Sequence, residues 1–308
     1  MVEPVPADAV QYAAAQLRRT AVGENPDIDP AMFWAAAIWE TLRIRRTTPA
    51  EWYAPHRSYP CPRGIRSTEA AAEAAGCGIP RALRLSGTGS NLPDTYGALR
   101  RSLVNHELGH LIANLQLISW SGHTALRPEH ARWEHGEVAL RVVLEQRCPQ
   151  PVAGFLSQFS GWTIGALFDK RTSGPTPTEN EAPPSHHAVE TLLALSAEVG
   201  MTAASTFPAL RPAPTVRVLP ERGTTVLVWS AAAMGANEQD LDHFDLLCGW
   251  WAQWLCLAAA SQNVSARPFR AFDEADFASR LRLPHDEQPL YALRLTKTRP
   301  SPLERTHP

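Results

Sequence analysis

The sequence predicts an α+β fold made of two similar halves, residues 1–150 and 151–308, that pack against each other as an internal pseudo-dimer. Three repeated features predict it: a helix ending, a long apolar helix and a closing apolar strand. The helix ending is Arg45-Arg46-Thr47-Thr48 in the first half and Lys170-Arg171-Thr172-Ser173 in the second. A duplicated unit that ends in a strand buries one face against its twin, so we expect the halves to share a seam.

The long helices and the closing strands recur in the same order. Apolar helices are predicted at 108–120 and 247–260. In each half a Pro-bearing strand-like turn, a short acidic helical stretch and an apolar strand follow, the strand at 138–144 in the first half and 289–295 in the second. The expected architecture is antiparallel-rich sheets flanked by helices.

The region before the first sheet is expected to be helical and then irregular. Apolar residues at helical spacing predict helices at 8–22 and 31–44, on either side of a turn rich in Asn, Pro and Asp. Prolines punctuate residues 49–79, which therefore predict a loop-bearing surface with one Ala-rich helix at 68–75. The Pro-rich segment 171–185 predicts a linker whose first residues can form a binding loop.

The second half has the clearest local signals. Residues 215–230 alternate as a β-hairpin with its turn at Pro220–Gly223. A long helix from about 240 to 261 is predicted to pack this half.

Composition excludes several classes of function. The chain has 308 residues, 44% of them hydrophobic, and a net charge of -2, which gives no electrostatic signature for nucleic acid or anionic membranes. No apolar run approaches the roughly 18 residues that span a bilayer, and the first residues lack a basic region before an apolar stretch, so a soluble cytoplasmic protein is expected. Five cysteines without a CxxC pair predict reduced thiols, with Cys248 and Cys256 in the core.

One motif points to a metal. His106-Glu107-Leu108-Gly109-His110 matches the zincin pattern, in which two histidines one turn apart bind zinc and the glutamate is the general base. A third ligand would come from downstream residues, namely Glu129, His130, Glu134 and His135. The corresponding helix 249–257 has no histidine or carboxylate, which favours ordinary helix residues and no metal site. A zinc metallopeptidase is therefore kept as an alternative.

A second motif set points to a flavin. Residues 244–260, with 266–273 and 281–284 after them, resemble the closing half of the FMN-dependent nitroreductase superfamily, closely over about 60 residues and loosely, through the repeat, over about 250. The same residues also resemble the subgroup that oxidises azolines in ribosomal peptide biosynthesis. The resemblance implies a nitroreductase-like fold in tandem-duplicated form. The first half would be degenerate, with a helical N-terminal extension, and the second would keep the flavin phosphate site.

The resemblance also implies flavin-binding residues. Arg171 and Ser173 would bind the FMN phosphate, because an Arg fork and a hydroxyl suit its oxygens. Arg46 and Thr48 would be their counterparts in the first half. The Arg270-Ala271 peptide would direct a backbone N–H toward flavin N5, although the family usually has an acidic residue and Gly there. Two basic residues after the last strand would reach the phosphate, Lys297 and Arg299.

The predicted activity is an FMN-dependent oxidoreductase, a dehydrogenase that tailors a peptide or small metabolite with biosynthetic partner proteins. Such an oxidation needs a base, and the candidates are Tyr96, Tyr291 and the pair His186-His187. The Lys-Tyr dipeptide of the azoline-oxidising subgroup is missing, which weakens that activity. A third hypothesis is a flavin-binding or cofactor-free pseudoenzyme that serves as a partner scaffold.

Overall fold

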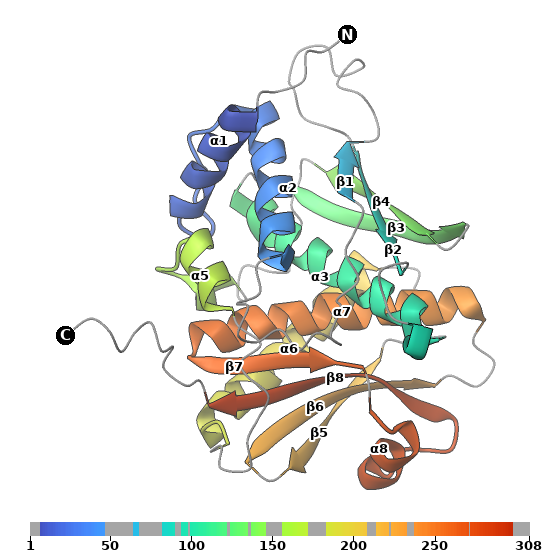
Figure 1. The fold of residues 1–308 in the computed structure, drawn as a ribbon. Coiled ribbons are helices and arrows are strands. Elements are labelled where there is room, and N and C mark those ends of the chain that lie inside the picture. Colours follow the sequence, from blue (N-terminus) through green and yellow to red (C-terminus); the bar gives the residue numbers. More distant parts are fainter. Residues whose placement is uncertain are drawn as a thin grey trace.

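Helices and antiparallel sheets make up both halves of the chain, which confirms the predicted α+β class (Figure 1). The structure is a computed structural model. The residues that it describes are 7–46, 64–67, 82–89, 94–97, 99–121, 124–134, 137–145, 156–171, 183–207, 214–221, 223–232, 237–270 and 272–297.

The first half has two helices, then a sheet interrupted by one long helix. Its four strands are antiparallel neighbours in the order β1-β2-β4-β3. The elements are α1 (Ala7–Arg19), α2 (Pro30–Arg46), β1 (Gly64–Ser67), β2 (Ala82–Thr88), α3 (Leu99–Ser121), β3 (Ala125–Glu134) and β4 (Glu137–Glu145).

The second half follows the same path. Its strands are ordered β5-β6-β8-β7, which is the strand order of the first sheet. Along the chain, one further helix lies between β7 and β8. The elements are α5 (Ile164–Lys170), α6 (His186–Thr206), β5 (Thr215–Glu221), β6 (Thr224–Ala232), α7 (Glu238–Ser261), β7 (Val264–Phe269), α8 (Glu274–Leu281) and β8 (Glu287–Lys297).

Some elements differ from the prediction. Helix α3 begins at Leu99, well before residue 108. The short acidic helix expected in the first half is a strand instead, because 125–134 pairs with β4 through a tight connection. Only the second half has that helix, as α8. The Ala-rich helix expected at 68–75 lies outside the described residues.

Helix α6 was not predicted, although its signals are local. The Ser185 side chain caps its start by accepting a hydrogen bond from the Ala188 N–H at 3.2 Å. Leu192, Leu195 and Val199 are buried along one face at helical spacing. The prolines before this helix predict a linker, and the amphipathic pattern that follows them was not recognised as a helix.

Helices α3 and α7 cross in the middle of the molecule, with one sheet on either side (Figure 1). A Cβ added to Gly109 would lie 2.1 Å from the Leu246 carbonyl oxygen, and one added to Gly249 would lie 2.1 Å from the His106 carbonyl oxygen. The contact is reciprocal, because each glycine faces the residue three positions before the other. Only glycine permits this backbone approach.

One apolar core spans the two halves. It contains Leu108 and Leu111 of α3 together with Trp250 and Trp254 of α7. None of the helices in the described part of the chain is long and apolar enough to cross a membrane.

Helix α8 covers the outer face of the second sheet. Phe277 is buried there in a small second core with Val226, Val228 and Leu219. Asp273 caps the helix by accepting hydrogen bonds from the backbone N–H groups of Ala275 at 2.9 Å and Asp276 at 3.0 Å.

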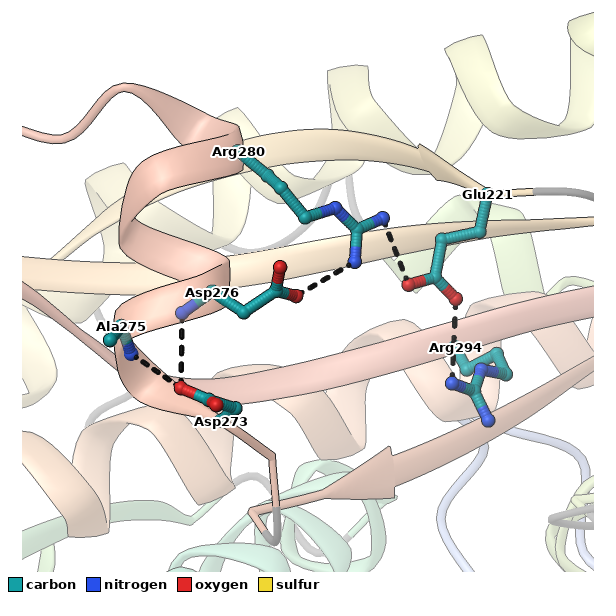
Figure 2. A network of polar contacts seen from close by, with 6 residues as sticks. All are labelled: Glu221, Asp273, Ala275, Asp276, Arg280 and Arg294. Atoms are coloured by element: carbon teal, nitrogen blue, oxygen red, sulfur yellow. Dashed lines mark hydrogen bonds and ion pairs between the residues drawn. The ribbon is translucent and has the colours of Figure 1, made fainter.

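A surface ion network joins α8 to the strands below it (Figure 2). Arg280 contacts Asp276 at 3.1 Å and Glu221 of β5 at 3.2 Å, and Glu221 also contacts Arg294 of β8 at 3.4 Å. The network fixes the orientation of α8, whereas the apolar contacts of Phe277 supply most of its stabilisation.

We expect Glu221→Gln to lower the free energy of unfolding by less than about 1 kcal/mol, because exposed ion pairs are screened by water. Phe277→Ala should cost about 3 kcal/mol, since it leaves a cavity. Urea denaturation at low and high salt measures both. A salt-independent loss in Glu221→Gln as large as that of Phe277→Ala would contradict this assignment.

Candidate active site

Arg171 lies directly after α5, where a flavin phosphate ligand was predicted. Leu167 and Phe168 anchor the helix in the core, and the Arg171 N–H donates to the Leu167 carbonyl at 3.0 Å. The Nε and Nη2 atoms of Arg171 are buried without a hydrogen-bond partner. Buried N–H donors of a charged group without partners are costly, so this position suits a bound anion.

The order of the described elements favours another first-half counterpart of Arg171 than Arg46. Among the described residues two helices precede each sheet, so a duplicated unit would match α5 with α1, and Arg171 with the pair Arg18-Arg19 that ends α1. Arg46 ends α2, and Thr48 lies outside the described residues. Arg18 binds the carboxylates of Glu40 and Asp169. Protein carboxylates therefore neutralise this first-half cation.

Of the remaining predicted flavin residues, the structure describes Arg270 and Lys297. Ser173, Ala271 and Arg299 lie outside the described residues. Arg270 follows β7 and is buried, with Nη2 2.6 Å from Glu274 Oε1 and the guanidinium over the Phe272 ring. Lys297 is exposed and pairs with Val264 at the start of β7, so it lies at the opposite end of that strand from Arg270.

A buried polar network occupies the α3–α7 crossing and reaches β8. His110 Nε2 lies 3.0 Å from the hydroxyl of Tyr291, and His110 Nδ1 lies 2.8 Å from Gln253 Oε1. Gln253 Nε2 donates to Asn114 Oδ1 at 2.7 Å. The Tyr291 ring also stacks on His106, with centroids 3.8 Å apart and planes 11° from parallel. All five side chains are buried.

The network fixes the tautomer of His110. Because the Gln253 amide nitrogen donates to Asn114, its oxygen faces His110 and accepts the Nδ1 proton. Nε2 of His110 is then a lone-pair acceptor, and the Tyr291 hydroxyl donates to it. The phenol is thus held against a neutral imidazole.

Asp245 and His106 form a second buried pair beside this network. His106 Nε2 lies 3.3 Å from Asp245 Oδ1, without the alignment of a hydrogen bond. Burial raises the pKa of Asp245 to about 7, against the opposing effects of the Ser102 hydroxyl and the Arg270 charge. Burial, and then the charge of Arg270, hold the pKa of His106 well below its usual range. In the folded protein Asp245 is therefore mainly neutral below about pH 7, and His106 is mainly neutral above its lowered pKa.

Arg101 closes the end of the crossing nearest solvent. Its Nε and Nη2 atoms donate to the two Asp242 oxygens at 2.7 and 2.5 Å, and its Nη1 donates to Glu238 at 2.6 Å. Asn105 donates to the same Asp242 at 2.7 Å. This bidentate arrangement raises the pKa of Arg101 and ties the start of α3 to the start of α7.

The zincin motif does not form a metal-ligand set among the described residues. Both ring nitrogens of His110 have hydrogen-bond partners, and His106 faces Asp245 and the Tyr291 ring. Glu129 binds Arg141 on the outer face of the first sheet. No group of three or more His, Cys, Asp or Glu gathers as a metal site within the ranges given above. His135 and the side chains of His130 and Glu134 lie outside the description.

The other predicted bases lie elsewhere. Tyr96 is half-buried in a short 3-10 helix ahead of α3. His186 and His187 are exposed at the start of α6, where His186 faces Glu190 at 3.3 Å.

Of the predicted bases, Tyr291 is the one held in the buried network by a histidine. The partners Gln253, Asn114 and Asp245 were missed. The available signal was the presence of single polar residues inside otherwise apolar helices.

Comparison with known proteins gives one distant similarity to report. No protein-family model matches the chain, and no curated protein does. Among solved structures, a candidate nitroreductase from Anabaena variabilis ATCC 29413 is 13% identical, with 71% of this chain and 69% of that chain covered and a TM-score of 0.48. That identity assigns no individual residue.

Proposed function

We propose that the chain is an FMN-dependent oxidoreductase of the nitroreductase type and that Arg171 binds the flavin phosphate. The observation that supports this most is that the buried Nε and Nη2 atoms of the half-buried Arg171 have no partner, at the position where the sequence predicts a phosphate ligand. Phosphate oxygens accept paired N–H bonds from such a fork. A bound phosphate would satisfy donors that the protein itself leaves unpaired.

FMN, when bound, supplies a hydride acceptor and donor at its N5 atom. In this proposal the backbone at Arg270-Ala271 faces N5. The Arg270 side chain binds Glu274 and lies over the Phe272 ring. An arginine at this position differs from the family pattern, but the proposed contact with N5 is made by the backbone and does not need that side chain. Ser173, Lys297 and Arg299 stay proposed phosphate ligands.

We further infer one flavin site per chain, in the second half. The first-half cation Arg18 is already bound by Glu40 and Asp169, which leaves it less able to bind phosphate. The shared strand order and the reciprocal Gly109–Gly249 crossing support descent from a duplicated unit. The resemblance to azoline-oxidising proteins favours a peptide or small metabolite as substrate.

The phosphate assignment predicts a loss of FMN affinity in Arg171→Ala. Charge-assisted hydrogen bonds contribute about 1.5 to 3 kcal/mol, so we expect Kd to rise about 10- to 100-fold. Arg171→Lys keeps the charge without the fork and should lose less. Quenching of FMN fluorescence measures the affinity.

Arg19→Ala is the matched control, because Arg19 is an exposed arginine at the end of α1. It should bind FMN as the unmodified protein does. Equal affinities for Arg171→Ala and the unmodified protein would overturn the phosphate assignment.

A further inference from the structure

We propose that Tyr291 is the acid–base residue of the redox reaction and that His110 exchanges protons with it. The substrate would then belong to the class that gains or loses a proton together with a hydride, such as a quinone, a carbonyl or an imine. This inference rests on the proposed FMN-dependent function.

The first supporting observation is the directed hydrogen-bond chain. It runs from Tyr291 to His110 at 3.0 Å, from His110 to Gln253 at 2.8 Å and from Gln253 to Asn114 at 2.7 Å. Because Gln253 fixes the Nδ1 proton, Nε2 of His110 can receive the phenolic proton directly. A base held in one tautomer and hydrogen-bonded to a hydroxyl is the arrangement that proton transfer requires.

The second observation is the position of Tyr291. It precedes Ala292, the strand partner of Phe269, so it lies level with Arg270 at the end of β7. Stacking on His106 fixes the plane of its ring, and the charge of Arg270 acts on that histidine. Tyr291 therefore lies on the strand beside Arg270, the residue at which the proposed function places N5.

The third observation is that the two histidines of this network have no histidine at the matching positions of α7. The reciprocal glycine contact matches Gly109 with Gly249, so His110 corresponds to Trp250 and His106 to Leu246. Trp250 and Leu246 are large residues, and both are buried in the crossing. The fold thus packs without histidines there, and buried polar groups cost free energy unless every one is paired.

When a substrate is oxidised, its proton binds the Tyr291 oxygen while the phenolic O–H bond breaks and that proton binds Nε2 of His110. When an acceptor such as menadione is reduced, protonated His110 returns its proton to Tyr291 as the phenol gives one to the acceptor oxygen. The accompanying hydride is exchanged with the flavin of the proposed function.

The test uses the full chain loaded with FMN and reduced by light with EDTA. Menadione needs a proton with its hydride, whereas ferricyanide accepts electrons without binding a proton. In Tyr291→Phe we expect the rate of flavin reoxidation by menadione to fall about 100-fold, within the range for general acid catalysis. Reoxidation by ferricyanide should change less than about twofold. His110→Gln should show the same selectivity and flatten the pH profile with menadione.

Tyr12→Phe is the control, since it also removes one phenolic hydroxyl, from an exposed tyrosine of α1, and it should behave as the unmodified protein. Equal losses with both acceptors, or no loss with menadione, would overturn the role of Tyr291.

A readout independent of turnover is the ¹⁵N NMR signal of His110, which should show an Nδ1–H tautomer whose Nε2 shift changes in Tyr291→Phe. An Nε2–H tautomer would contradict the relay. Absence of FMN binding would instead overturn the proposed function, and the NMR result would still decide the hydrogen-bond geometry.

Discussion

Gly109→Ala and Gly249→Ala are each expected to lower the free energy of unfolding by about 3 kcal/mol or more. The new Cβ would lie 2.1 Å from a backbone oxygen of the opposite helix, so α3 and α7 must separate by more than about 1 Å along their crossing. Alanine favours a helix by up to about 1 kcal/mol relative to glycine, which is too little to compensate. The neighbouring tryptophans and leucines would lose contacts as the helices part.

Urea denaturation of both variants tests this expectation. Gly89→Ala is the matched control, because its Cβ would lie 3.2 Å from the Arg100 Cβ, a contact that a shift of a few tenths of an ångström relieves. We expect less than about 1 kcal/mol for the control. If either variant were as stable as the wild type, the stability of the protein would not depend on the close contact between α3 and α7.

Asp245→Asn is expected to stabilise the protein by roughly 2 to 4 kcal/mol at pH 8 and to change its stability little at pH 4. The pKa of Asp245 is raised from 3.8 to about 7 by burial. Between these values the folded state binds more protons than the unfolded state, so stability falls as pH rises through this window. Asparagine has a similar shape without the charge and removes that loss.

His106 has the opposite pH dependence. Its pKa in the folded protein is well below 6.5, so the unfolded state binds more protons below that pH and stability rises as pH approaches 6.5. Below pH 6.5 the two groups change the stability in opposite directions as the pH rises. Between pH 6.5 and 7 only Asp245 contributes to the pH dependence. Thermal unfolding from pH 4 to pH 8 measures both. An equal effect of Asp245→Asn at both ends of that range would contradict a buried carboxyl that titrates near 7.

Much of the fold could be predicted because its signals are local. The hairpin of β5 and β6 follows from alternation and a Pro–Gly turn, and α7 follows from a long apolar run. The first half was harder. Residues 125–134 contain acidic and proline residues that suggested a short helix, but their pairing with β4 across the sheet decides the structure.

The candidate site, like the fold, was predictable only where its signals are local. Arg171 and Tyr291 could be proposed as candidates from position and residue type. The hydrogen bonds of Tyr291 could not, because His110, Gln253 and the tyrosine belong to three elements that meet only after α3 and α7 cross. The His-Glu-x-x-His spacing predicted two histidines facing one metal. Instead, partners on α7 and β8 take up their polar atoms, and no local pattern reveals those partners.

The central claim is that the second half binds one flavin. Titration of FMN into the purified full chain, followed by its visible absorption and by equilibrium dialysis, tests this most directly. Our account predicts saturation at one FMN per chain, with a shifted flavin band. No binding would contradict the proposed oxidoreductase, and two equivalents per chain would contradict the closed first-half site.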